Sequence, residues 1–162
     1  MNLINELYLR MIEFNSCDPK RIQHFTKVHS YAKLIAECEN IGTDTQFILE
    51  AAALTHDIGI RPAEKEFGRC DGKLQEQIGP AYAEKMLSDL NFDKSVIERV
   101  SYLIAHHHTY SNVDGIDYQI LIEADFIVNL FEANMAKGTI IKTIENIFKT
   151  KTGISICKTM FL

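Results

Sequence analysis

Histidine and aspartate side chains occur at four places in this sequence where the neighbouring residues are apolar. The set comprises three imidazoles and two carboxylates: His29, His56, Asp57, His107 and Asp125. A buried charge or a buried imidazole without a partner is costly, so each of these groups needs compensation. Mixed nitrogen and oxygen donors without a thiolate suit a divalent metal ion such as Mn, Fe, Co, Ni, Zn or Mg. The set therefore predicts a site for a divalent metal ion.

Each member of the set also has a purely structural interpretation. The aspartate of the His56-Asp57 pair could cap a helix end, where charges interact with the helix dipole. A single histidine on an apolar face is commonly a hydrogen-bonded core residue, and a buried aspartate such as Asp125 commonly pairs with a base. Together, however, the five groups fit metal coordination better than five independent structural roles.

Helical periodicity predicts where the first histidine lies. Apolar residues at helical spacing indicate a helix at the N-terminus, and Asp18-Pro19 is a start signal for a second helix that should extend to about Asn40. His29 follows Phe25 by four residues within the apolar stripe of this second helix, so we expect it to face inward. His24 lies on another side of the same helix, and we expect it to lie outside the site.

The next helix is expected to begin at Thr43 or Asp44 and to end in the His56-Asp57 pair. The polar stretch Arg61 to Lys73 is then predicted to be a loop, alone or with a short helical turn, since it contains two glycines. A helix is expected to begin at about Pro80, or one turn earlier, and to end at Leu90.

A later helix, capped by Asp93, has a core face that ends on His107. His106 and His108 lie about 100° to either side of it. Periodicity thus favours His107 as a ligand, and the position of His108 just before a loop keeps it as an alternative. Asp125 follows within an apolar helix, and the C-terminal tail indicates one more helix.

The helical periods predict an all-α protein of six to eight helices. The length predicts a single domain, residues 1–162, with a core at about residues 19–132. The chain has 162 residues, of which 46% are hydrophobic, enough for one core. Neither an 18-residue apolar run nor a signal peptide is seen, so we expect a cytoplasmic protein without a membrane partner. The net charge of −5 argues against a nucleic acid polymer as partner. A homodimer is compatible with these totals.

The order of these residues resembles a known family. His29, then His56-Asp57, then Asp125 is similar to the H…HD…D pattern of the HD superfamily of metal-dependent phosphohydrolases. The resemblance extends from about Arg21 to Asn129. It implies a helical HD-type fold in which His29, His56, Asp57 and Asp125 bind one metal ion.

Many HD relatives with two metal ions add one histidine after the HD loop and another on the following helix. This chain has Gln75-Glu76-Gln77 in the first of these segments, where Glu76 could serve as an oxygen ligand. His107 or His108 could supply the second ligand. The resemblance therefore leaves the number of metal ions open.

The resemblance implies hydrolysis of a small phosphate ester, such as a nucleotide, by a water that the metal activates and that Asp57 orients. Arg61, close behind the pair, is expected to take part in catalysis and to contact the phosphate. The other candidate phosphate contacts are Lys33, Lys73 and Lys151. The basic residues between Lys65 and Lys73 also fit a solvated charged loop. Two other functions compete: a non-catalytic module that binds nucleotide and regulates a partner, and a di-iron oxygenase.

Overall fold

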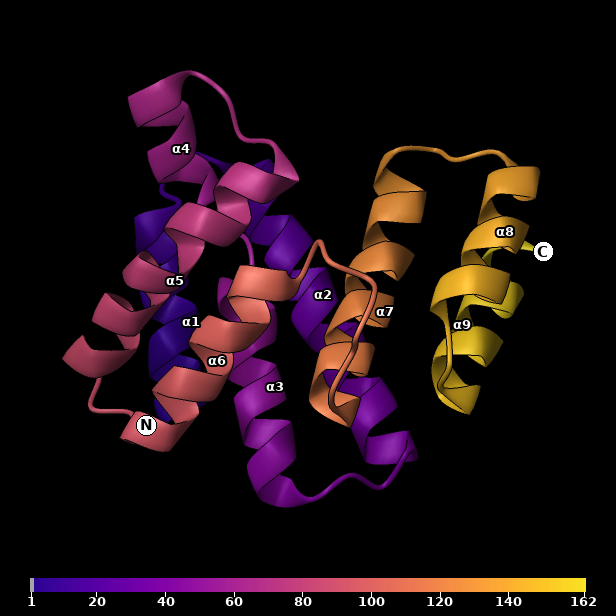
Figure 1. Ribbon diagram of the computed structural model, residues 1–162, viewed down its shortest axis with the longest axis horizontal. Coiled ribbons are helices and arrows are strands. Elements are labelled where there is room, and N and C mark those ends of the chain that lie inside the picture. The colour runs from indigo at the N-terminus through magenta and orange to yellow at the C-terminus, as the bar shows by residue number, and fades with distance from the viewer. Residues whose placement is uncertain (1) are drawn as a thin grey trace.

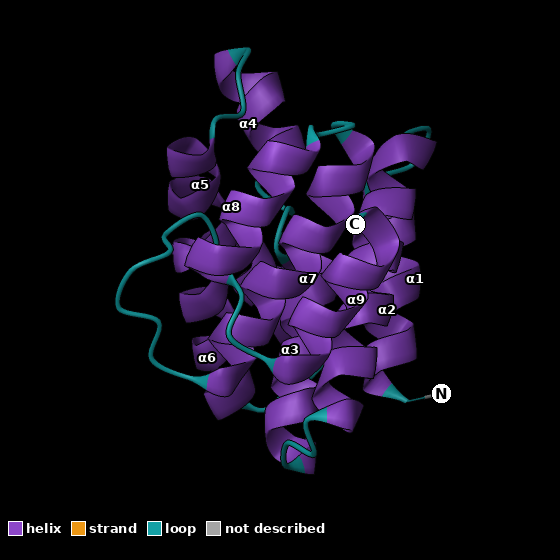
Figure 2. Cartoon of the chain, turned by 90° about the vertical axis from the view of Figure 1, so that its right-hand side faces the viewer, coloured by secondary structure: helices purple, strands orange, loops and turns teal. Residues whose placement is uncertain are grey.

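The computed structural model describes residues 2–162, and this part of the chain consists of helices joined by loops (Figure 2). Nine helices follow one another in the described residues: α1 Leu3–Phe14, α2 Pro19–Cys38, α3 Thr43–Thr55, α4 Ile60–Phe67, α5 Gly72–Asp89, α6 Lys94–His106, α7 Ile116–Glu132, α8 Lys137–Ile147 and α9 Lys151–Phe161. The expected all-α class is confirmed. The number of helices exceeds the expected range because two predicted segments each contain an additional helix.

The expected start of α2 is confirmed. Asp18 is its N-cap, and the carboxylate accepts a hydrogen bond of 3.0 Å from the backbone N–H of Arg21. Pro19 occupies the first helical position, where a missing N–H costs nothing. This rigid start fixes how the first turns of α2 are presented to the neighbouring helices.

The stretch from Arg61 to Lys73, which was expected to be a loop with at most a short helical turn, contains a full helix. Its first half is α4, which ends at Gly68 in the left-handed region with φ of 67°. Helix α5 begins at Gly72, about two turns before Pro80, because Asp71 caps it by accepting a hydrogen bond from the N–H of Leu74. The helix was expected to begin at about Pro80, but this proline lies inside α5.

The C-terminal tail forms two helices, α8 and α9, which lie beside α7 (Figure 1). The segment between them is held by Glu123 of α7, which is fully buried. Its carboxylate accepts hydrogen bonds from the backbone N–H groups of Lys149 and Thr150 at 2.6 and 2.9 Å. Thr150 in turn caps α9. A buried carboxylate thus fastens the last two helices to the rest of the fold.

The buried apolar side chains form a cluster shared by all helices except the short α4. Helix α2 packs against α3 and α7, and α3 also packs against α6. The ends of these central helices meet at the polar side chains described next. In the described part of the chain, no helix has the length and apolarity needed to cross a bilayer.

Candidate metal centre

Two histidines and two aspartates from three central helices converge in the structure. His24 lies on α2, His56 and Asp57 directly follow α3, and Asp125 lies on α7. The Nε2 atom of His24 is 3.3 Å from Oδ2 of Asp57 and 3.2 Å from Oδ1 of Asp125. The Nε2 atom of His56 is 3.4 and 3.5 Å from the same two oxygens. None of the four side chains is more than 15% exposed.

The hydrogen bonds of the two imidazoles define how they face the cluster. Nδ1 of His56 is 2.9 Å from the backbone oxygen of Ala53. A carbonyl can only accept a hydrogen bond, so Nδ1 carries the hydrogen and Nε2 of the neutral ring is an acceptor. Nδ1 of His24 is likewise 2.9 Å from a carboxylate oxygen of Glu132. The two Nε2 atoms therefore face one another, 3.3 Å apart, as acceptors that need a shared cation or proton.

These residues fit a divalent cation. Nitrogen and oxygen ligands lie about 2.0–2.2 Å from a bound first-row cation such as zinc, so adjacent ligands are separated by roughly 3.0–3.5 Å. The distances among His24, His56, Asp57 and Asp125 fall in this interval. Each imidazole is also oriented by a hydrogen bond at its other nitrogen, as is usual for metal-binding histidines.

A second group shares Asp57 with the first and adds His107 and His108. Nε2 of His107 lies 3.5 Å from Oδ1 of Asp57, is buried, and has no hydrogen-bond partner among the described residues. Its Nδ1 donates to the backbone oxygen of Ile104 at 2.7 Å. Asp57 thus presents one oxygen to the first group and the other to the second. The arrangement offers two adjacent positions for cations.

His108 is held at the edge of the second group. Its Nε2 lies 2.9 Å from Oε1 of Gln75, and the amide nitrogen of Gln75 donates to the backbone oxygen of Cys70 at 2.7 Å. Burial, and then the neighbouring His107, lower the pKa of His108 to about 4. The ring is therefore neutral near pH 7, as a metal ligand must be.

The buried charges of the first group shift one another's pKa values. Burial alone lowers the pKa of His56, but Asp57 and Asp125 outweigh it and raise this pKa well above its ordinary value. Burial raises the pKa of Asp57, whereas the facing His56 and His107 bring it well below the ordinary value. Without a cation, the site therefore favours protonated imidazoles beside ionised carboxylates, so protons and cations compete for it.

The structure corrects the assignment of the first histidine. His29 was expected in the site, but its Nε2 lies 3.0 Å from Oε2 of Glu50, and it lines a different pocket, between α1, α2 and α3. His24, which was expected to lie outside, occupies the place beside His56. Both histidines flank the apolar stripe of α2, on sides that face different neighbours. Periodicity shows that a side chain points inward, but it does not show which helix that side chain meets.

Glu76 belongs to neither group of possible ligands. Its Oε1 accepts hydrogen bonds from the backbone N–H of His108 at 3.0 Å and from the hydroxyl of Thr109 at 2.9 Å. It thereby holds the end of α6 in place. His106 also lies outside both groups, and its Nδ1 donates to the backbone oxygen of Tyr102. Of the histidine run, His107 and His108 meet the site.

The side chains that were expected to contact phosphate do not join the histidine and aspartate cluster. Arg61 donates to the backbone oxygen of Ser16 at 3.1 Å, and Lys33 pairs with Glu50 at 3.6 Å. Lys73 and Lys151 are exposed, and no ion pair joins them to the cluster in the described residues. Arg61 was chosen because it is close to the His56-Asp57 pair in sequence, and Lys33 because it lies one turn beyond His29. Both side chains contact other partners in the fold.

Sequence reasoning missed two cations that lie next to the site. Arg21 and Lys27 are each three residues from His24 on α2, so they flank it on the same face of the helix. Arg21 forms ion pairs with Asp18 and Glu64, and Lys27 with Glu132. The sequence shows that Arg21 and Lys27 are each three residues from His24. This spacing points to the site only once His24 is known to belong to the cluster.

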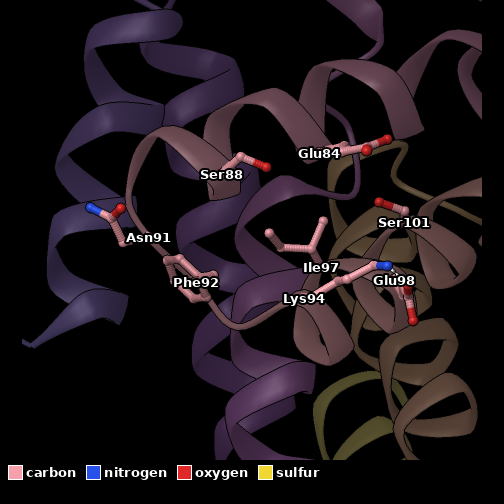
Figure 3. A pocket seen from close by; sticks show the side chains of 8 residues that line it. All are labelled: Glu84, Ser88, Asn91, Phe92, Lys94, Ile97, Glu98 and Ser101. Atoms are coloured by element: carbon pink, nitrogen blue, oxygen red, sulfur yellow. Dashed lines mark ion pairs between the residues drawn. The ribbon is translucent and has the colours of Figure 1, made fainter.

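A broad surface pocket of about 770 Å³ lies elsewhere, between α5 and α6. Figure 3 shows the carboxylates of Glu84 and Glu98, the ammonium group of Lys94 and the ring of Phe92 around it. No residue of the histidine and aspartate cluster lines this pocket. Its size alone therefore gives no reason to assign it the chemistry of the protein.

Comparison with known families agrees with this geometry. The HD domain family matches residues 21–144, which is most of the chain. The chain belongs to the HD domain family. Within the H…HD…D pattern of this family, the structure places His24 together with His56-Asp57 and Asp125. The cluster is compatible with a divalent metal ion, as expected for this HD protein.

A solved structure supports the same assignment. The crystal structure of a predicted HD superfamily hydrolase from an uncultured Thermotogales bacterium is 26% identical in sequence to this HD protein, with a TM-score of 0.67. The match covers 96% of this chain and 83% of the other. The comparison with curated proteins gave no match.

Proposed function

We propose that this HD protein is a metal-dependent phosphohydrolase that acts on a nucleotide or another small phosphate ester. The observation that carries the proposal is the convergence of His24, His56, Asp57 and Asp125, with two imidazole acceptors facing one another. Membership of the HD family and the likeness to a predicted HD superfamily hydrolase support it. The protein would bind one cation if only the first group is filled, and two if the position at His107 and His108 is filled as well.

The four side chains of the first group would hold the cation. A divalent cation bound there supplies two effects, since it lowers the pKa of a water molecule and polarises a phosphoryl oxygen. Asp57 faces both groups of ligands with its two oxygens. Its carboxylate would hold the cation and, by accepting a hydrogen bond, would also orient the attacking water.

Arg21 and Lys27 are the residues proposed to receive the charge of the phosphate. They flank His24 on the same face of α2, within one turn of it. In the free protein their charges are paired with Glu64 and Glu132. A phosphate oxygen can compete for these pairs because arginine and lysine both bind phosphate through charge-assisted hydrogen bonds.

The test begins with the metal content of the protein as purified. Phosphate release is then measured on a panel of nucleotides and other phosphate esters with Mn, Co, Ni and Mg. Metal-dependent release from at least one compound is expected, together with its loss in the Asp57→Asn variant. Tight nucleotide binding without release would instead favour the non-catalytic regulatory function, and iron content with oxygen consumption would indicate the oxygenase.

A further inference from the structure

Helix α7 contacts the imidazole of His24 at both ring nitrogens. Oδ1 of Asp125 lies 3.2 Å from Nε2, and Oε2 of Glu132 lies 2.9 Å from Nδ1. Asp125 and Glu132 are seven residues apart, which is about two turns, so both side chains project from the same face of α7. The ring therefore lies between two carboxylates that one helix holds at a fixed separation.

Glu132 is itself held in place. Its other carboxylate oxygen, Oε1, pairs with Nζ of Lys27 at 2.8 Å, and the side chain is only 21% exposed. Lys27 also lies over the ring of Phe131, 5.4 Å from its centroid. These contacts leave Oε2 of Glu132 free to accept the hydrogen of His24 Nδ1. The Lys27–Glu132–His24 chain thus ends at Nδ1, the ring nitrogen on the opposite side from Nε2, which faces the cluster.

Two other histidines of the site are oriented by backbone oxygens and not by a carboxylate. His56 and His107 each donate from Nδ1 to a backbone oxygen three residues earlier, that of Ala53 and that of Ile104. Those acceptors come with the helix and do not depend on a side chain. The acceptor for Nδ1 of His24 instead comes from another element, because it is the side chain of Glu132 on α7.

We propose that Glu132 is a positioning residue for His24. It keeps the hydrogen of the imidazole on Nδ1 and fixes the ring plane, so that Nε2 is directed at the cation position beside His56. An anionic acceptor also makes Nε2 a better electron donor, as hydrogen-bonded carboxylates do for other metal-binding histidines. The inference rests on the metal-binding part of the proposed function and is independent of the substrate.

The experiment compares three variants with the wild-type protein. Glu132→Leu removes the acceptor with little change in side-chain volume, and Glu132→Gln keeps a neutral acceptor. Glu98→Leu is the matched control, because Glu98 is exposed and pairs with Lys94 at the surface. Zinc and manganese affinities are measured by calorimetry on protein stripped of metal. Long-range proton–nitrogen NMR spectra of the metal-free proteins report the hydrogen on Nδ1 of His24.

Cation affinity is expected to fall about 10- to 100-fold in Glu132→Leu, as for other side chains that orient metal ligands. A smaller loss is expected in Glu132→Gln, and none in Glu98→Leu. The protected Nδ1 hydrogen of His24 should be lost in Glu132→Leu and kept in Glu132→Gln. A role in folding alone would lower thermal stability and leave the affinity of the folded protein unchanged.

Unchanged cation affinity in Glu132→Leu, with the Nδ1 hydrogen still protected, would overturn the positioning role. A wild-type protein that binds no cation would contradict the proposed function. The NMR measurement needs no metal, so it decides the contact between Glu132 and His24 in that case as well. If Glu132→Leu does not fold, the cation affinity of Glu132→Gln decides the matter. An affinity of Glu132→Gln equal to that of the wild type would then overturn the proposal.

Discussion

His29 and Glu50 join the middle of α2 to the middle of α3, with Nε2 of the imidazole 3.0 Å from Oε2 of the carboxylate. The two helices form an antiparallel pair around the turn between Cys38 and Thr43, so residues equally far from that turn lie opposite each other. When residues are counted from this turn along both helices, His56 lies opposite about position 25 of α2. His24 is one residue from that position, and His29 is about 140° away from His24 around the helix.

Removal of His24 is therefore expected to affect the metal centre, and removal of His29 is not. His24→Ala takes away one of the facing imidazoles, so cation affinity should fall by more than about 100-fold, beyond the effect of removing a residue that only orients a ligand. His29→Ala leaves Glu50 with Lys33 and Gln46 as partners. Its expected effect is a loss of about 1 kcal/mol in the free energy of unfolding, with unchanged metal content.

Both variants can be measured by elemental analysis after purification and by urea denaturation of the metal-free proteins. The comparison is internally controlled, because each variant removes one imidazole from the same helix. Loss of metal in His29→Ala with full occupancy in His24→Ala would show that the cation lies elsewhere in the fold.

The sequence was sufficient to predict the helical class, the start of α2 and the inward positions of His56, Asp57 and Asp125, which lie together in the structure. Those predictions depend on local signals: a cap, a proline at the first helical position, and polar residues on apolar faces. The choice between His24 and His29 depends on which helix packs against each side of α2. The position of the turn between α2 and α3 determines this packing, but the packing becomes clear only when residues of the two helices are matched across the turn.

The phosphate contacts were harder to predict for a related reason. Arg61 is four residues from Asp57 in sequence, yet it donates to the backbone oxygen of Ser16. A charged side chain several ångströms long reaches in a direction set by the packing of its helix, and α4 was not expected to be a helix. Distance along the sequence is therefore a poor guide to which cation lies beside a buried site.

Metal removal should destabilise the protein more at alkaline pH than at acidic pH. The pKa values of His24 and His56 are raised in the metal-free fold, because Asp57 and Asp125 outweigh the effect of burial. A raised pKa in the folded state contributes stability that is full below the unfolded value near 6.5 and is lost as pH rises through the folded value. A bound cation replaces those protons, so the loaded protein should not lose this stability.

The midpoint of thermal unfolding, measured with and without a chelator, tests this expectation. The difference between the two midpoints should grow from pH 6 to pH 8.5, and cation binding should release protons over the same interval. Calorimetry in buffers of different ionisation enthalpy counts those protons. A difference in midpoint that shrinks as pH rises would contradict the competition between protons and cations.

Asp57 is expected to be the least replaceable carboxylate, because its two oxygens serve both groups of ligands. Asp57→Asn should abolish detectable cation binding and phosphate release. His108→Ala removes only a residue of the second group, so at least one bound cation should be retained. Asp89→Asn is the matched control, since Asp89 pairs with Lys85 on the surface. Equal cation stoichiometry in Asp57→Asn and the wild type would exclude this carboxylate as a ligand.

The turn that follows Asp57 has no room for a side chain at Gly59. A Cβ atom there would lie 2.9 Å from the backbone nitrogen of Gly79 and 3.0 Å from the backbone oxygen of Gln75. These contacts are with the backbone of α5, which cannot move aside as a flexible side chain would. Gly59→Ala should therefore lower the free energy of unfolding by about 1–3 kcal/mol, as overpacking does in other tightly packed sites.

The same change should weaken cation binding, because the α5 backbone would push the turn that carries Asp57. Gly138→Ala provides the control, since Gly138 lies in α8 with nothing within 4 Å of its Cβ position. Alanine is the better helix former there, so a neutral or slightly stabilising effect is expected. Urea denaturation and calorimetry on both variants measure the two effects. A Gly59→Ala protein as stable as Gly138→Ala would mean that the contact between this turn and α5 is looser than the structure shows.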